Sequence, residues 1–170
     1  MPIIEPAIRP PAEAESFLLQ VTLGCSANSC TFCGAYQGKP FRVKKMTDIT
    51  ADIEQASKYF PDTRRVCLLD GDALALSNVR LVPILLQLNQ AFPRLNRIAS
   101  YANGYNITSR SAAELQELYR HKLRLIYIGL ESGSQKVLDH CQKRSSVAEM
   151  VTAVRRAEES GIKSSVIVLL

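Results

Sequence analysis

Short β-favouring runs alternate with helix-length amphipathic segments along this chain, and this alternation constrains the fold more than any other feature. Strands are expected at residues 17–22, 65–69, 97–101, 125–130 and 164–170. Strand, helix, strand repetition with nearly continuous apolar strands is typical of a parallel sheet, because each return connection needs a helix that covers the sheet. The pattern predicts an α/β fold, either an open doubly wound sheet or part of a barrel with its helices outside.

Apolar residues at helical spacing and capping signals mark the helices between these strands. The two clearest stripes are Ile49, Ile53, Ala56 and Phe60, and then Leu81, Ile84, Leu85, Leu88 and Phe92. Ser111 with Glu114, and Ser146 with Glu149, have the spacing of capping boxes at the start of two later helices. Gly161 suits the C-terminus of the last helix.

The first fifteen residues differ in composition from the rest of the chain. They contain Pro2, Pro6, Pro10 and Pro11, which favour extended backbone and oppose a helix. We expect residues 1–15 to form an extended leader packed on the outside of a single domain at residues 16–170. Because the chain stops within an apolar strand, we also expect it to be part of a longer protein.

The chain carries no signal for a membrane. Its longest apolar runs, at residues 81–88 and 166–170, are far shorter than the roughly 20 residues of a spanning helix, and its start lacks a signal-peptide pattern. We expect a cytoplasmic protein with no membrane partner. The net charge of +5 is spread along the chain, with one concentration that is more typical of a solvated loop than of an RNA or anion site: Lys39, Arg42, Lys44 and Lys45.

The cysteines give the most specific chemical signal. The chain has five, an odd number, and Cys25, Cys30 and Cys33 fall within nine residues, which suits metal ligation better than a disulfide scaffold. They follow the first strand, at the end where α/β barrels place their chemistry. Three thiolates on a [4Fe-4S] cluster leave one iron without a protein ligand. Cys67 and Cys141 are expected to be small buried side chains.

The segment from Gly24 to Gly34 resembles the signature of the radical S-adenosylmethionine (SAM) superfamily, C-x3-C-x2-C with an aromatic residue before the last cysteine. Phe32 occupies that aromatic position. The first gap has four residues instead of three. A zinc site with three cysteines and a distant fourth ligand is the alternative.

Two later segments resemble the same superfamily. Residues 69–74 are similar to its small-small-acid segment, which implies that Gly71 and Asp72 face the methionyl amino group of SAM, although Asp70 replaces the usual first glycine. Residues 128–134 are similar to its G-x-E-S-G segment, which implies that Glu131 and Ser132 face SAM, with Glu131 accepting from the ribose hydroxyls. Taken alone, each acid is also compatible with a helix cap.

Three further residues are candidates for the same rim of the sheet. Ser100 and Asn103 follow the third strand and could contact SAM or substrate, although ordinary turn chemistry explains them equally well. Arg144 resembles a basic position that meets the SAM carboxylate in some relatives; a solvated arginine is the alternative.

The resemblance covers residues 16–170 and implies a partial (β/α)6 barrel of the TIM type, here truncated to about five β/α units. It is nearest to the coproporphyrinogen oxidase, Elongator and methylthiotransferase group. It implies an oxygen-sensitive enzyme with a [4Fe-4S] cluster and SAM as cofactors, and a flavodoxin or ferredoxin as electron donor. Its reaction would be reductive cleavage of SAM to a 5′-deoxyadenosyl radical that abstracts hydrogen from a substrate, which the sequence does not identify.

Two other hypotheses remain at this point. The first is a zinc- or cluster-stabilised binding module without catalysis, acting on RNA through the basic residues between Lys39 and Lys45. The second is that the truncated chain is inactive alone, because a parallel sheet with exposed edges is prone to self-association.

Overall fold

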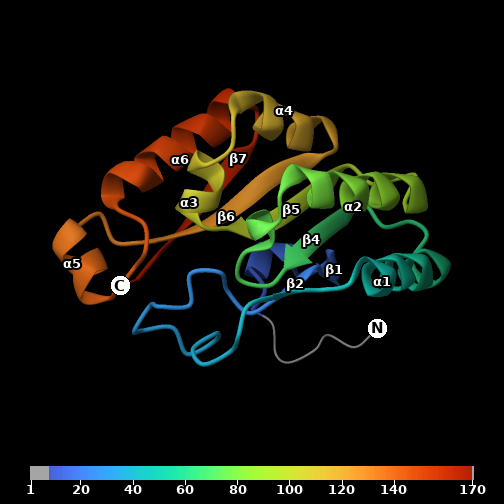
Figure 1. The fold of residues 1–170 in the computed structure, drawn as a ribbon. Helices are drawn as coiled ribbons and strands as arrows, with labels where there is room; N and C mark the ends of the chain where they lie inside the picture. Colours follow the sequence, from blue (N-terminus) through green and yellow to red (C-terminus); the bar gives the residue numbers. More distant parts are fainter. Residues whose placement is uncertain (1–7, 170) are drawn as a thin grey trace.

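The computed structural model describes residues 8–169, and its core is a five-stranded parallel sheet. The strands lie side by side in the order β1 (Phe17–Gln20), β4 (Arg65–Leu69), β5 (Arg97–Ala102), β6 (Leu123–Glu131) and β7 (Lys163–Val168) (Figure 1). All five expected strands are confirmed close to their predicted limits. Leu170 and residues 1–7 of the leader lie outside the described residues.

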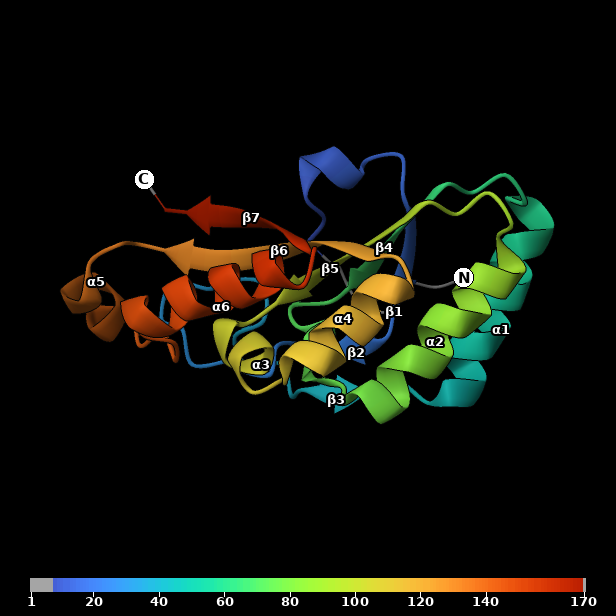
Figure 2. The same ribbon diagram turned by 90° about the horizontal axis from the view of Figure 1, so that it is seen from above.

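The helices cover one face of this sheet. The longer ones are α1 (Met46–Tyr59), α2 (Asn78–Ala91), α4 (Ala112–Arg120) and α6 (Val147–Glu159), and the short ones are α3 (Gly104–Thr108) and α5 (Gln135–His140). Seen from above, the four longer helices lie on the same side of the sheet (Figure 2). Strands in chain order with helices on a single face form a segment of a barrel, whereas a doubly wound sheet has helices on both faces.

The predicted helix signals have mostly the expected roles. The capping box of Ser111 and Glu114 is formed, and the Ser146 hydroxyl accepts from the Glu149 N–H. The stripe along α2 is fully buried. Phe60 is the exception, because α1 ends at Tyr59 and the Phe60 side chain is 60% exposed.

The helix-covered face, which we call the outer face, is aliphatic. Alternate strand residues point into it, because successive side chains of a strand face opposite ways. They pack with the helix stripes into the main core: Leu19, Val66, Leu68, Ile98, Ile126 and Ile128. Burial of this aliphatic surface is the main source of stability in the fold.

The opposite face, which we call the inner face, has a different composition. Its first row across the sheet is Leu18, Cys67, Ala99 and Leu125, and its second row is Gln20, Leu69, Tyr101 and Tyr127. The rings of Tyr101 and Tyr127 pack with their centroids 5.8 Å apart. Because this face corresponds to the interior of a barrel, polar groups can meet there out of contact with the helices.

The described part of the leader, residues 8–15, departs from the predicted extended course at one turn. Residues Pro11–Glu13 form a short 3-10 helix, which a proline tolerates in its first turn, where no N–H bond is needed. In Figure 2 this turn lies on the side of the sheet away from the helices. Within the described residues, the segment 11–13 therefore covers part of the inner face.

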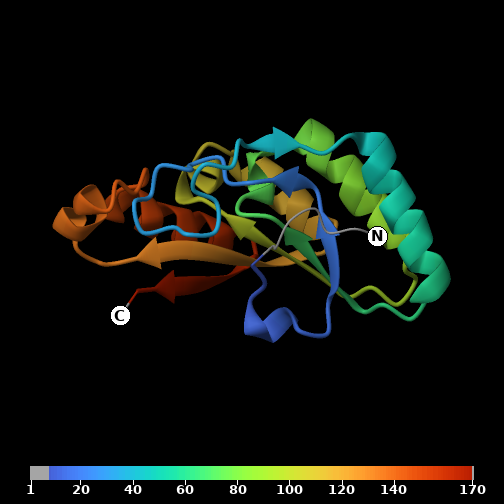
Figure 3. The same cartoon turned by 90° about the horizontal axis from the view of Figure 1, so that it is seen from below.

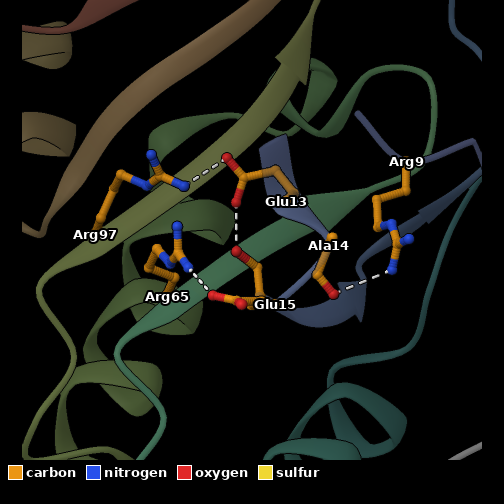
Figure 4. Close-up of polar contacts among 7 residues, drawn as sticks. Arg9, Glu13, Ala14, Glu15, Arg65 and Arg97 are labelled. Carbon is orange, nitrogen blue, oxygen red and sulfur yellow. Dashed lines mark hydrogen bonds and ion pairs between the residues drawn. The ribbon is translucent and has the colours of Figure 1, made fainter. Parts of the chain in front are cut away.

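Glu13 anchors the leader there through a buried polar cluster. Its carboxylate is fully buried and accepts from Arg97 of β5 at 2.7 Å, from the Tyr127 hydroxyl at 2.7 Å and from Ser16. Two residues on, Glu15 pairs with Arg65 of β4, also at 2.7 Å, but its side chain is 83% exposed (Figure 4). Of these two ion pairs with neighbouring strands, that of Glu13 has a buried carboxylate and that of Glu15 an exposed one.

A second, two-stranded sheet was not predicted. Strands β2 (Thr22–Leu23) and β3 (Arg42–Val43) pair in antiparallel fashion and close the loop that contains the three clustered cysteines. Among residues 8–169, no helix is both long enough and apolar enough to cross a membrane.

Candidate active site

The cysteine loop between β2 and β3 lies at the C-terminal end of the parallel strands (Figure 3). Its far side is tied to the segment after α5, where the Thr31 N–H donates to the Cys141 carbonyl at 3.0 Å and the Ser29 hydroxyl donates to the Gln142 carbonyl at 3.0 Å. The Cys33 N–H donates to the Cys30 carbonyl, which forms a tight turn between these two cysteines. The loop is therefore held at its base by the β2–β3 pair and at its far side by the segment after α5.

Cys25, Cys30 and Cys33 line one cavity of about 260 Å³. All three are free thiols of intermediate exposure. The other walls include the inner-face rings and both later motifs: Phe32, Tyr36, Gly71, Tyr101, Asn103, Tyr127, Glu131 and Lys143. Three unpaired sulfur donors facing a common space fit the chemistry of an iron-sulfur cluster. Within residues 8–169, no group of three or more His, Cys, Asp or Glu side chains is arranged to hold a single metal ion.

The remaining cysteines have different surroundings. Burial raises the pKa of the Cys67 thiol to about 12, which keeps it protonated and inert at neutral pH. Cys141 follows α5 and is partly exposed, so the expectation of a buried side chain is wrong for it.

Among the cysteines of the cavity, burial raises the pKa of the Cys30 thiol, while the nearby Lys143 charge lowers it.

The segment from Asp70 to Asp72 clamps the first cysteine. The Asp70 carboxylate accepts from the Gly24 N–H at 3.1 Å, and the Asp72 carboxylate accepts from the Ser26 hydroxyl, so the two acids bind the residues on either side of Cys25. Gly71 lies between them, and a Cβ there would be 2.8 Å from the Cys25 Cβ. Only glycine permits this close approach.

The pKa of each acid is raised, in both cases mainly by burial. For Asp70, bonds from the Gln20 amide at 3.0 Å, from Gly24 and from the Tyr36 hydroxyl at 3.4 Å oppose the burial effect. The ring of Tyr36 lines the cavity, and burial followed by the Asp70 charge raises the pKa of its phenol.

Asp72 is fully buried and is surrounded by protein donors. One oxygen accepts from the Asn103 N–H at 3.2 Å. The other accepts from Ser26, from the Asn103 side-chain amide at 2.9 Å and from the Asn106 amide. Burial raises the pKa of Asp72 while these bonds lower it. Both carboxylate oxygens of Asp72 thus accept bonds from the cysteine loop and from the start of α3, while the expected contact with the SAM amino group stays a prediction.

Glu131 forms a buried ion pair inside the cavity. Its carboxylate accepts from the Lys143 ammonium at 3.0 Å, and the two side chains are only 10% and 7% exposed. Glu131 has a φ of +63°, next to an irregular register at Gly129, and such backbone features are concentrated at functional sites. Gly129 lies beside this pair, and a Cβ there would be 2.9 Å from the Lys143 Nζ, so a larger residue would displace the ends of both charged side chains.

Three predicted residues have other surroundings. Ser100 is fully buried. Because the next residue, Tyr101, points to the inner face, the Ser100 side chain points to the outer face. The Ser100 hydroxyl donates to the Tyr101 carbonyl. The Ser132 hydroxyl accepts from the Ser134 N–H in the turn before α5. Arg144 is exposed, with its guanidinium 4.4 Å from the ring centroid of Tyr105.

The sequence did not single out Lys143, Asn106 or Tyr36. Lys143 directly precedes Arg144, and nothing in the sequence indicates which of the two cations faces the cavity. Asn106 lies three residues after Asn103, a spacing that places both amides on one side of a helix start, so this signal was present. The Arg110 guanidinium donates to the carbonyls of Leu74 and Asn106. These bonds join α3, which contains Asn106, to the segment after Asp72.

Comparison with known proteins gives one family and several related folds. The Radical SAM superfamily profile matches residues 19–170. No curated protein sequence matches.

Solved structures share the fold at low sequence identity. The cobalamin-dependent S-adenosylmethionine radical enzyme OxsB, with aqua-cobalamin and S-adenosylmethionine bound, superposes with a TM-score of 0.68 at 18% identity, over 91% of this chain and 24% of OxsB. Methylornithine synthase (PylB) gives 0.66 at 15% identity, over 89% of this chain and 43% of that enzyme. Coproporphyrinogen III oxidase (HemN) from Escherichia coli gives 0.64 at 12% identity, over 90% and 36%. The chain thus spans about a quarter of OxsB.

Proposed function

Since this chain belongs to the radical SAM superfamily, whose enzymes use a [4Fe-4S] cluster and SAM, we propose that its cavity is the cofactor site of such an enzyme. When bound, a reduced cluster supplies the electron that cleaves SAM to a 5′-deoxyadenosyl radical, which abstracts hydrogen from the substrate. A flavodoxin or ferredoxin is the proposed electron donor. The observation that carries the proposal is that three free thiols and a buried ion pair line one cavity at the C-terminal end of the sheet.

In this proposal Cys25, Cys30 and Cys33 hold the cluster as thiolates. Their loop is fixed by the Asp70–Asp72 clamp on one side and by the Cys141–Gln142 carbonyls on the other. Such supporting bonds orient metal ligands and reduce the entropy that binding costs. Desolvation raises the pKa of Cys30, so the nearby Lys143 cation assists its thiolate form.

The same cavity offers complementary groups for SAM. Lys143 is a buried cation that suits a carboxylate, and the Glu131 carboxylate suits a pair of ribose hydroxyls. The rings of Tyr101 and Tyr127 provide an apolar wall that excludes water. Lys143 therefore replaces Arg144 as the proposed partner of the SAM carboxylate, while Gly71 and Phe32 contribute backbone and ring surface.

The test is anaerobic reconstitution with iron and sulfide, followed by electron paramagnetic resonance (EPR) of the reduced protein with and without SAM. We expect a [4Fe-4S] signal that SAM changes, and loss of most iron and signal in Cys30→Ala. Cys141→Ala is the matched control, because Cys141 is also a partly exposed thiol near the loop but belongs to the segment after α5. Equal losses in the two variants, or one tightly bound zinc with no response to SAM, would refute the proposal.

A further inference from the structure

The Asn103 side chain connects the buried Asp72 to the first cysteine of the loop. Its amide nitrogen lies 2.9 Å from the Asp72 carboxylate, 3.3 Å from the Ser26 hydroxyl and 3.7 Å from the Cys25 sulfur. The last distance is within hydrogen-bond range for a sulfur acceptor. Each amide has two N–H groups, so one can serve the carboxylate while the other points to the thiolate.

Asp72 fixes the orientation of this amide. Its carboxylate can only accept when ionised, so it selects the nitrogen of the Asn103 amide and turns the oxygen away. It also accepts the backbone N–H of Asn103, which fixes the start of α3 relative to the cysteine loop. The Asn103 donor is therefore held in place and does not rotate freely beside the sulfur.

We infer that Asp72 and Asn103 act on the cluster through Cys25, with Asn103 donating a hydrogen bond to the sulfur and Asp72 acting as the positioning residue behind it. A donor to a cluster thiolate stabilises the more negative, reduced state and so raises the reduction potential. Through Asn103, Asp72 would then influence how readily the cluster takes up an electron. This inference rests on the proposed function, because it needs a cluster bound to Cys25.

Asn106 provides a closely matched control. Its amide also donates to the Asp72 carboxylate and lies 3.4 Å from the Ser26 hydroxyl, but the contact to the Cys25 sulfur comes from Asn103. Removing either amide therefore takes one donor from Asp72. Removing Asn103 also takes the donor from the sulfur.

The experiment is a redox titration of the reconstituted protein, followed by EPR, in the wild type, Asn103→Ala and Asn106→Ala. We expect Asn103→Ala to shift the midpoint potential to more negative values with its iron content retained, and Asn106→Ala to stay close to the wild type. An unchanged potential in Asn103→Ala, or equal shifts in both variants, would overturn the inference. If the wild type assembles no cluster, the proposed function fails as well, so the two failures are distinguishable.

A second measurement needs no substitution of Asn103. In wild-type protein labelled with 15N at the asparagine side chains, electron–nuclear double resonance of the reduced cluster should detect a coupled amide nitrogen. That coupling should persist in Asn106→Ala. Absence of any such coupling in the wild type would overturn the inference even if Asn103→Ala failed to fold.

Discussion

The outer and inner faces of the sheet come from the same five strands but differ in what they carry. On the outer face, alternate residues are aliphatic and pack against helices in one continuous core. On the inner face, the intervening residues include two tyrosines and a cysteine, and they meet the buried Glu13 at one end and the cysteine loop at the other. Because successive residues of a strand point to opposite faces, the residues that form the stabilising core are different from those that line the candidate site. Substitutions on the two faces should therefore have different consequences.

The largest effect is expected on the outer face. Leu68→Ala should lower the free energy of unfolding by about 3 kcal/mol, because it removes a fully buried side chain and leaves a cavity between sheet and helices. Urea denaturation measures this loss. The neighbouring Cys67→Ala is the control on the inner face and should cost about 1 kcal/mol, since a single sulfur is removed. Equal losses at these adjacent positions would contradict the proposed division between the faces.

A smaller effect is expected at the base of the inner face. Glu13→Gln should lower the free energy of unfolding by about 2 kcal/mol, because it removes the charge that compensates the partly buried Arg97. Glu15→Gln is the matched control: it breaks an ion pair of the same length whose carboxylate is 83% exposed, and should have no measurable effect. If both variants behaved alike in urea denaturation, burial would not distinguish the two pairs of the leader.

The smallest effect is expected at the top of the inner face, on binding rather than folding. Lys143→Met should weaken the binding of SAM to the reconstituted protein about tenfold, as expected for loss of one charged hydrogen bond. Arg144→Met should leave the affinity near the wild-type value, because that side chain is exposed beside Tyr105. Equilibrium dialysis with labelled SAM measures both. A stronger effect of Arg144→Met would restore the assignment made from the sequence.

The sequence was sufficient to predict features that depend on local pattern. The alternation of strands and helical stripes, the capping box of Ser111 and the position of Gly161, with its φ of +84°, are all local signals, and the structure confirms them. The β2–β3 pair was missed because two-residue strands have no periodicity to detect. The turn at Pro11–Glu13 was missed because the prolines were taken to exclude every helical turn.

The site was predicted at the level of segments but less well at the level of side chains. Which face of the sheet a residue points to depends on register, and a shift of one position decides between Ser100 and Tyr101. Lys143 and Arg144 lie between α5 and α6, where no periodic pattern indicates which of them faces the cavity. The burial of Asp72 could not be read from its motif either. It depends on Ser26 in the cysteine loop and on Asn103 and Asn106 at the start of α3.

The anchoring of Glu13 also bears on how the chain folds during its synthesis. Its partners Arg97 and Tyr127 follow it by 84 and 114 residues, so Glu13 leaves the ribosome well before the strands that bury it. Until β5 and β6 emerge, the Glu13 carboxylate remains hydrated, since burial without a partner is unfavourable. The buried contacts of Glu13 therefore require β5 and β6 to be in place, which makes them long-range contacts of the kind that slow folding.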